Sequence, residues 1–199
     1  MTPVRSDPYP GAGRSGGGSG AALDLALLRW ARSRGHPPGA ERAVARFSAL
    51  GEHGAVWLAL GGAGWALDRR RRPGWRRATL TVEAAYLANT GIKLVVGRRR
   101  PELEDLPPLA GTPTRLSFPS AHAATSFAGA RAFSRLGAPA APCYALALAL
   151  AASRVYLGVH YPSDVAAGAL LGALLGAAVP LPGPAELAEE AGSRAGESA

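Results

Sequence analysis

The chain has 199 residues, which is enough for one domain with a sizeable core, and a formal net charge of +8 at neutral pH. This positive charge indicates an anionic partner, either nucleic acid, a membrane surface or a phosphorylated small molecule. The single cysteine, Cys143, excludes a disulfide framework and a thiolate metal site within one chain.

The N-terminal segment, residues 1–20, is rich in glycine, proline and serine and has no apolar stretch like that of a signal peptide, so we expect a disordered tail. An amphipathic helix is predicted over residues 21–34, with Asp24 and Arg32 on its polar face. Its apolar face consists of Leu23, Ala26, Leu27 and Trp30. Residues 41–51 repeat the pattern, with Val44, Phe47 and Leu50 at helical spacing. Both helices suit a membrane surface.

Five apolar segments follow, each a candidate to cross a bilayer, which requires about 20 mostly apolar residues. They are residues 50–67, 78–97, 121–137, 141–158 and 164–180. In the last segment, Gly168, Gly172 and Gly176 recur at every fourth position, either as a smooth strip for close helix packing or as a consequence of an Ala- and Gly-rich composition.

These segments predict an all-α protein, an integral-membrane helical bundle of about five transmembrane helices with N-terminal interfacial helices. The membrane domain is expected to span residues 21–182, and residues 183–199 form a polar C-terminal tail. Six arginines occupy the short loop expected between the first two spans, which the positive-inside rule places in the cytoplasm. Other arginines on the opposite face weaken this orientation signal.

Three short motifs stand apart from the apolar segments. They are KLVVGRRRP at residues 93–101, PSAH at 119–122 and SRVYLGVHYPSD at 153–164. The first ends the second span, the second opens the third span, and the third joins the fourth span to the fifth. Counting membrane crossings therefore places all three motifs at the same face, where they are expected to form one site.

The residue types in these motifs suit the handling of a phosphoryl group, which requires convergent cations and NH donors. Lys93, Arg100 and Arg154 would supply the cations. Pro119 and Ser120 predict a helix start, where free backbone NH groups point toward an anion.

Two histidines can divide the chemical work. His160 is the candidate nucleophile, because a neutral imidazole can attack phosphorus and form a phosphoenzyme. Asp164 follows Pro162 at a predicted helix start and can bond the far ring nitrogen of His160. His122 is then the candidate general acid for the departing alkoxide and later the base that activates water.

Taken together, the motifs resemble the signature of the type-2 phosphatidic acid phosphatase superfamily. These membrane lipid phosphatases share a helical catalytic core with vanadium-dependent haloperoxidases and bacterial class A acid phosphatases. The family signature is Lys, six residues, Arg-Pro; then Pro-Ser-Gly-His; then Ser-Arg, five residues, His, three residues, Asp, and all of these spacings are present here. One residue departs from it, since Ala121 replaces the glycine; alanine retains the backbone NH, and we expect activity to survive.

The resemblance implies a role for each matching residue. The phosphate-binding residues would be Lys93, Arg100, Ser120, the Ala121 backbone NH and Arg154. His160 would be the nucleophile, His122 the acid, and Asp164 the residue that orients His160. No metal or other cofactor is implied, and the sequence contains no cluster of His, Cys and carboxylate residues at ligand spacing. The expected partners are a lipid-linked phosphate substrate and membrane lipids, with no nucleic acid and no obligatory protein partner.

Within the superfamily, the short stretches GEHG at residues 51–54 and GTPTRLSFPSAH at 111–122 are similar to the actinobacterial decaprenylphosphoryl-5-phosphoribose phosphatases. That similarity implies an enzyme that forms decaprenylphosphoryl ribose for cell-wall arabinan. We expect it in the bacterial plasma membrane, with an extracytoplasmic site opposite the arginine-rich loop and a phosphohistidine intermediate. Undecaprenyl diphosphate, phosphatidylglycerophosphate and phosphatidic acid are alternative substrates. A vanadate-dependent haloperoxidase and a non-enzymatic membrane scaffold are the alternatives from other classes.

Several polar residues keep more than one interpretation. Lys93 taken alone fits a lysine that snorkels at the end of a span. His53 is expected at the interface or in contact with substrate, and Arg98 and Arg99 are candidates for binding a second phosphate or lipid headgroups. The acidic loop at residues 102–105 is expected to be solvated rather than to bind magnesium.

Overall fold

The computed structural model describes residues 19–180, which form an all-α fold as predicted. Its seven α-helices are α1 (Ser19–Arg32), α2 (Pro38–Ala49), α3 (Ala55–Leu67), α4 (Arg72–Val96), α5 (Ala121–Arg135), α6 (Ala140–Tyr156) and α7 (Pro162–Ala178). Two short 3₁₀ helices, η1 (Glu52–Gly54) and η2 (Arg69–Arg71), precede α3 and α4. The predicted tails lie outside this range, except that residues 19 and 20 begin α1.

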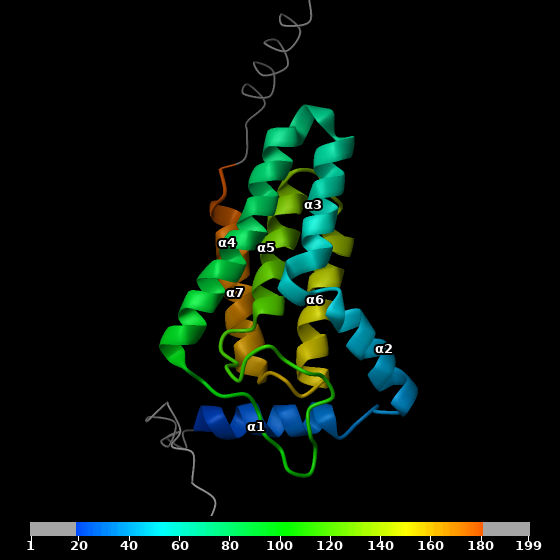
Figure 1. Cartoon of the computed structure of the whole chain (residues 1–199), viewed down its shortest axis with the longest axis vertical. Coiled ribbons are helices and arrows are strands. Elements are labelled where there is room, and N and C mark those ends of the chain that lie inside the picture. Colours follow the sequence, from blue (N-terminus) through cyan, green and yellow to red (C-terminus); the bar gives the residue numbers. More distant parts are fainter. Residues whose placement is uncertain (1–18, 181–199) are drawn as a thin grey trace, which may run out of the picture.

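Helices α3 to α7 form an upright bundle, and α1 lies across one end of it (Figure 1). The five predicted apolar segments correspond to these five helices. Helix α5 is central, because it packs against α4, α6 and α7. Helix α3 starts later than expected, at Ala55, because Gly54 has a left-handed φ of 74° that separates η1 from the helix.

The arginine-rich segment is helical, so its prediction as a loop was wrong. Arg69–Arg71 form η2, and the following arginines already belong to the first turns of α4. The Asp68 side chain accepts a hydrogen bond from the Arg71 backbone NH, and Pro73 lies in the first turn of α4. Both features favour a helix start, since proline needs no NH partner there and a carboxylate satisfies a free donor.

The predicted glycine strip on α7 is confirmed as a close-packing surface. Gly168, Gly172 and Gly176 are all buried on α7. A Cβ atom added at Gly172 would lie 2.1 Å from the Ala124 carbonyl oxygen, and one at Gly168 would lie 2.4 Å from the Ser120 carbonyl oxygen. The two helix backbones therefore approach closely, which fixes the start of α5 relative to the start of α7.

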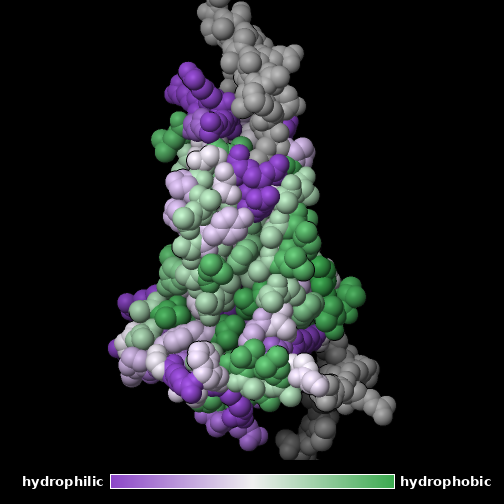
Figure 2. Space-filling view, turned by 180° about the vertical axis from the view of Figure 1, so that it is seen from behind, coloured by the Kyte–Doolittle hydropathy of each residue, from purple (hydrophilic) through white to green (hydrophobic). Residues whose placement is uncertain are grey.

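Small residues line the faces at which α5 and α7 pack, and many leucines lie on the outside of the bundle, although Trp57 and Phe133 are buried in its core. Alanines and glycines dominate the buried faces of α5 and α7. Exposed side chains include Leu80, Leu87, Leu94, Leu148, Leu170 and Leu174. On the face that Figure 2 views, hydrophobic side chains occupy the middle of the bundle, and the most hydrophilic ones gather toward its two ends. Among the helices of residues 19–180, none combines the length and the apolar character needed to cross a bilayer.

Helix α1 turns its polar face inward. Asp24, Leu28 and Arg32 are buried, whereas Leu23 and Trp30 are largely exposed. Arg32 Nη2 donates to the Pro107 carbonyl oxygen at 2.7 Å, which ties α1 to the long loop between α4 and α5. The predicted amphipathic helix is present, and its polar residues contact the protein instead of solvent.

Candidate active site

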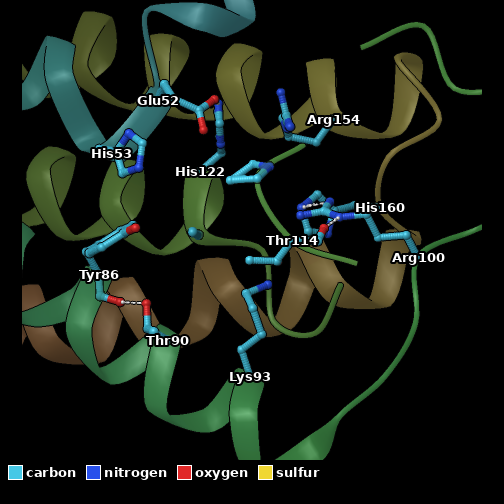
Figure 3. A pocket seen from close by; sticks show the side chains of 12 residues that line it. Glu52, His53, Tyr86, Thr90, Lys93, Arg100, Thr114, His122, Arg154 and His160 are labelled. Carbon is cyan, nitrogen blue, oxygen red and sulfur yellow. Dashed lines mark hydrogen bonds and ion pairs between the residues drawn. The ribbon is translucent and has the colours of Figure 1, made fainter. Parts of the chain in front are cut away.

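The three sequence motifs meet in one pocket at the end of the bundle near α1, as the crossing count predicted (Figure 3). The pocket is lined by Glu52, His53, Tyr86, Thr90, Lys93, Arg100, Pro113, Thr114, Ala121, His122, Arg154 and His160. Six of the eight residues proposed from the sequence are among them. The other two, Ser120 and Asp164, are buried directly behind the lining residues.

Lys93, in the last turns of α4, holds the segment that leads into α5. Its Nζ donates to the carbonyl oxygens of Leu116 and Ser117 at 3.3 Å and of Pro119 at 2.9 Å. An ammonium group has three donors around one atom, which suits three converging carbonyls better than a planar guanidinium does. Lys93 thus both lines the pocket and positions the start of α5.

Helix α5 presents its N-terminus to the pocket through Ala121. Ser120 is the N-cap residue, as predicted, but its hydroxyl does not cap the helix and has no hydrogen-bond partner. The Ser120 backbone NH donates to the Asp164 carbonyl oxygen at 2.9 Å, which joins α5 to the first turn of α7. Ala121 has an ordinary helical conformation, so the alanine at this position introduces no strain.

His160 lies between Arg100 and Asp164, and these partners define its tautomer. Arg100 Nη1 lies 3.0 Å from His160 Nε2, and a guanidinium can only donate, so Nε2 carries the lone pair. The ring hydrogen is then on Nδ1, which faces Asp164 Oδ2 at 3.4 Å. Burial is the main reason that the pKa of His160 is lowered to about 4, with Asp164 opposing this shift and Arg100 adding to it. The imidazole is therefore neutral near pH 7.

His122 has the opposite tautomer, with its ring hydrogen on Nε2. Its Nε2 lies 3.0 Å from the Ser48 main-chain carbonyl oxygen, which can only accept, so Nε2 carries a hydrogen. Gly51 packs against the same ring, and a Cβ atom there would lie 2.8 Å from His122 Cδ2. The two imidazoles thus face one pocket with Nε2 as an acceptor in His160 and as a donor in His122.

Two arginines concentrate positive charge beside His160. Burial, followed by the like charge of Arg154, lowers the pKa of Arg100 to about 10, so the guanidinium stays protonated at neutral pH. Arg154 Nη1 donates to the Ser48 hydroxyl at 2.7 Å, and the same hydroxyl accepts from Ser153 Oγ at 2.9 Å. Ser48, near the end of α2, therefore positions Arg154 through its side chain and His122 through its carbonyl group.

A second network supports Asp164 from behind. Asp164 Oδ2 accepts from the Tyr161 backbone NH at 2.9 Å, and Oδ1 accepts from Arg98 Nη1 at 2.8 Å. Arg98 Nη2 donates in turn to Asp24 on α1 at 2.7 Å, and Asp24 also accepts from the backbone NH and the hydroxyl of Ser163. These bonds to Asp24 and Asp164 raise the pKa of Arg98 despite its partial burial. Arg98 therefore connects helix α1 to the carboxylate behind His160.

Several buried polar atoms at the site lack a hydrogen-bond partner within the part of the chain that the structure describes. They include Ser120 Oγ, Arg154 Nε and His160 Nδ1. Unpaired buried donors cost free energy, so an anion that accepted bonds from Ser120 and Arg154 would stabilise the site. Residues 19–180 contain no group of three or more His, Cys, Asp or Glu side chains arranged to hold a metal ion.

Sequence reasoning missed several residues that the structure brings to the site. Ser48, Tyr86, Thr90 and Asp24 lie in helices without a motif, and each is one polar residue among many. Glu52 belongs to the GEHG stretch, which drew attention only as a similarity, whereas His53 of the same stretch was already a candidate for contact with substrate. For Ser48, the one signal in the sequence is a polar residue in a helix whose neighbouring residues include apolar ones such as Phe47.

An all-helical core with two imidazoles, two arginines and a helix N-terminus around one pocket is suited to binding a phosphoryl group. The PAP2 superfamily model matches residues 75–182, and the chain belongs to this superfamily. Membership confirms the class predicted from the motifs, a metal-independent lipid phosphate phosphatase.

Curated relatives are similar over most of their length. The decaprenylphosphoryl-5-phosphoribose phosphatase of Mycolicibacterium smegmatis is 42% identical over 131 residues, which cover 66% of this chain and 72% of that protein. The protein of the same name from Mycobacterium tuberculosis is 41% identical over 135 residues, covering 67% and 75% of the two chains.

Two solved structures share the fold. Aquifex aeolicus LpxE superposes with a TM-score of 0.68 and 28% identity, over 78% of this chain and 93% of that chain. A transmembrane PAP2 type phosphatidylglycerolphosphate phosphatase from Bacillus subtilis superposes with a TM-score of 0.65 and 23% identity, over 78% and 81%.

Proposed function

We propose that this protein removes the 5-phosphate of decaprenylphosphoryl-5-phosphoribose and releases decaprenylphosphoryl ribose, a precursor for cell-wall arabinan. The observation that carries the chemistry is the pair of imidazoles with opposite Nε2 hydrogen-bonding roles in one cation-rich pocket. The substrate assignment rests on the relatives that bear this name and are about 42% identical to the chain.

In the first step, Arg100 Nη1 leaves His160 Nε2 for a phosphoryl oxygen of the bound substrate, and the freed lone pair of Nε2 attacks phosphorus. Arg100, Arg154, the Ser120 hydroxyl and the NH groups at the start of α5 bind the phosphoryl oxygens, where negative charge is held in the transition state. The bond from phosphorus to the leaving oxygen breaks with its electron pair. His122, protonated once the anionic substrate is bound, gives a ring proton to that oxygen, and the products are an alcohol and phosphohistidine.

In the second step, neutral His122 accepts a proton from water, and the water oxygen attacks phosphorus. The phosphorus–nitrogen bond breaks, its electron pair returns to His160 Nε2, and inorganic phosphate leaves. Asp164 supports both steps, because its carboxylate stabilises the positive charge on the His160 ring while nitrogen is bonded to phosphorus. No step requires a metal ion.

We also propose that helices α3 to α7 are embedded in the bacterial plasma membrane, with α1 at its surface and the pocket facing the extracytoplasmic side. Many exposed leucines around the bundle, and small residues where α5 packs against α7, are the distribution expected when lipid surrounds a bundle. A water-soluble fold would leave fewer large apolar side chains exposed. The exposed Leu23, Leu27 and Trp30 of α1 suit the interface.

A phosphate-release screen tests the proposal. Purified protein in detergent would be offered lipid-linked pentose 5-phosphate, polyprenyl diphosphate, phosphatidylglycerophosphate and phosphatidic acid, each with and without EDTA. We expect the highest kcat/KM for the pentose phosphate and no effect of the chelator. Preference for a glycerophospholipid or a diphosphate would overturn the substrate assignment, and strong inhibition by EDTA would overturn the mechanism.

A further inference from the structure

The pocket has two chemically different ends. Arg100, Arg154 and His160 lie together at one end in Figure 3, and His53, Tyr86 and Thr90 lie at the other. His122 lies between the two groups, with Glu52 beside it. The second end carries hydroxyl, imidazole and carboxylate groups but no arginine among the pocket-lining residues of the described chain.

The direction of the reaction determines which part of the substrate reaches each end. Attack at phosphorus places the nucleophile opposite the leaving oxygen, so a group that protonates this oxygen lies on the leaving side. His160 and His122 therefore define a line through the pocket. The alcohol part of the substrate extends past His122, toward Glu52, His53, Tyr86 and Thr90.

The turn that contains Glu52 and His53 is shaped to face this end. His53 has a φ of 51° and Gly54 a φ of 74°, and His53 is the one residue other than glycine with positive φ in residues 19–180. This conformation places the centroid of the His53 ring 5.5 Å from the centroid of the Tyr86 ring on α4. Residues other than glycine adopt it at a cost in free energy, which indicates that the surroundings hold the turn in place.

Glu52 is available to a ligand. Its side chain is 41% exposed, and His122 Nε2 lies 3.8 Å from Oε2, beyond hydrogen-bond distance. The charges of Arg100 and Arg154 act on this carboxylate through space. A carboxylate accepts two hydroxyl hydrogens of a vicinal diol, and an aromatic ring packs against the face of a sugar. A hydrocarbon chain such as a prenyl tail would form no hydrogen bonds with these groups and would have to desolvate the carboxylate.

We infer that Glu52, His53, Tyr86 and Thr90 form a subsite for the pentose ring on the leaving side of the phosphate, with Glu52 accepting hydrogen bonds from the sugar hydroxyls. This inference rests on the proposed function and names the residues that select its substrate. It separates phosphate binding, at the arginine end, from sugar recognition at the GEHG turn.

The test compares Glu52→Gln and Tyr86→Phe with matched controls that lie outside the pocket, Glu104→Gln in the exposed acidic loop and Tyr144→Phe on α6. Three substrates would be used: the lipid-linked pentose 5-phosphate, a prenyl phosphate without hydroxyl groups, and para-nitrophenyl phosphate. We expect both subsite variants to lose about 10- to 100-fold in kcat/KM for the pentose phosphate alone, because a site built for hydroxyl groups discriminates strongly by them. The control variants should behave as wild type with all three.

Each other outcome has a definite consequence. If Glu52→Gln lowers kcat/KM equally for the pentose and the prenyl phosphate but not for the aryl phosphate, Glu52 acts through His122 and the subsite is wrong. If the wild type prefers the pentose phosphate but neither variant changes that preference, the subsite is wrong and the proposed function stands. If the wild type does not distinguish the pentose from the prenyl phosphate, both are wrong.

Discussion

The pocket end of the bundle and the interface between α5 and α7 are held together by different kinds of contact. Around the pocket, buried polar groups are fixed by directed hydrogen bonds, such as those from Lys93 to three carbonyl oxygens. Along the interface, close backbone approach at three glycines holds the helices together, and Arg135 donates to carbonyl oxygens only at the far end of α7. The first arrangement sets the positions of single atoms, and the second sets the positions of whole helices.

This difference has a consequence for mutation. Replacement of a polar residue in the pocket should lower the rate of phosphate release while the protein stays folded. The addition of one methyl group at the α5–α7 interface should disturb the fold, and activity should fall only as a result. Four substitutions separate these two kinds of effect, from the largest expected effect to the smallest.

Loss of the nucleophile should have the largest effect on rate. We expect His160→Gln to lower kcat by about 10,000-fold or more, because the covalent route then has no attacking atom. The variant should remain folded, since α6 and α7 keep their contacts. The measurement is phosphate release together with the thermal unfolding midpoint in detergent. Residual activity within tenfold of wild type would show that another group attacks phosphorus.

A methyl group at Gly172 should have the largest effect on stability. The added Cβ would lie 2.1 Å from the Ala124 carbonyl oxygen, so the helices must separate. We expect Gly172→Ala to destabilise the fold by about 3 kcal/mol, as overpacking of a close interface does. Gly62→Ala on α3 is the control, because nothing lies within 4 Å of its added Cβ. Equal unfolding midpoints for the two variants would contradict the close approach of α5 and α7.

Loss of the Ser48 hydroxyl should weaken phosphate binding without moving His122, the proposed general acid. Ser48→Ala removes the acceptor of Arg154 Nη1 but keeps the carbonyl group that holds His122. We expect kcat/KM to fall about tenfold, equally for alkyl and aryl phosphates, since one charged donor loses its partner. Ser134→Ala, at the far end of α5, is the control. A loss confined to alkyl phosphates would mean that Ser48 acts through His122 instead.

Loss of the contact between Asp24 and Arg98, which connects α1 to Asp164, should have the smallest effect on kcat. Asp24→Asn weakens the anchor of Arg98, and we expect kcat to fall about threefold to tenfold because Asp164 is then less well oriented. Asp105→Asn is a matched control, since it removes the other ion pair of α1, with Arg29, which is exposed and contributes little. If both variants leave kcat unchanged, α1 has no part in positioning the site.

The sequence predicted the helices of the bundle and the three motifs of the pocket, but not the residues that surround those motifs. The five bundle helices and the convergence of three motifs followed from apolar segments and from counting crossings, because a helix that ends at one face must begin again there. The Gly168, Gly172 and Gly176 repeat likewise indicated an interface, since spacing alone places these residues on one face. Such inferences need only periodicity.

The surroundings of the site could not be predicted in the same way. Ser48 lies 74 residues from His122 along the chain, and Asp24 lies 74 residues from Arg98, so no local pattern joins them. The sequence placed Asp24 on the polar face of an amphipathic helix, and such a face normally contacts water. Its burial depends on Arg98 and Ser163, which the tertiary fold brings to it. The same holds for Lys93, whose partners are main-chain carbonyls that no side-chain pattern shows.

The most direct test of the mechanism is to trap the phosphoenzyme with the His122→Asn variant and radiolabelled para-nitrophenyl phosphate. This leaving group needs no protonation, so His160 should still be phosphorylated, whereas breakdown lacks its base and should be slow. We predict a burst of nitrophenol equal to the enzyme concentration and an acid-labile label located on His160 by mass spectrometry. Turnover without covalent label, or a label on any other residue, would contradict the account.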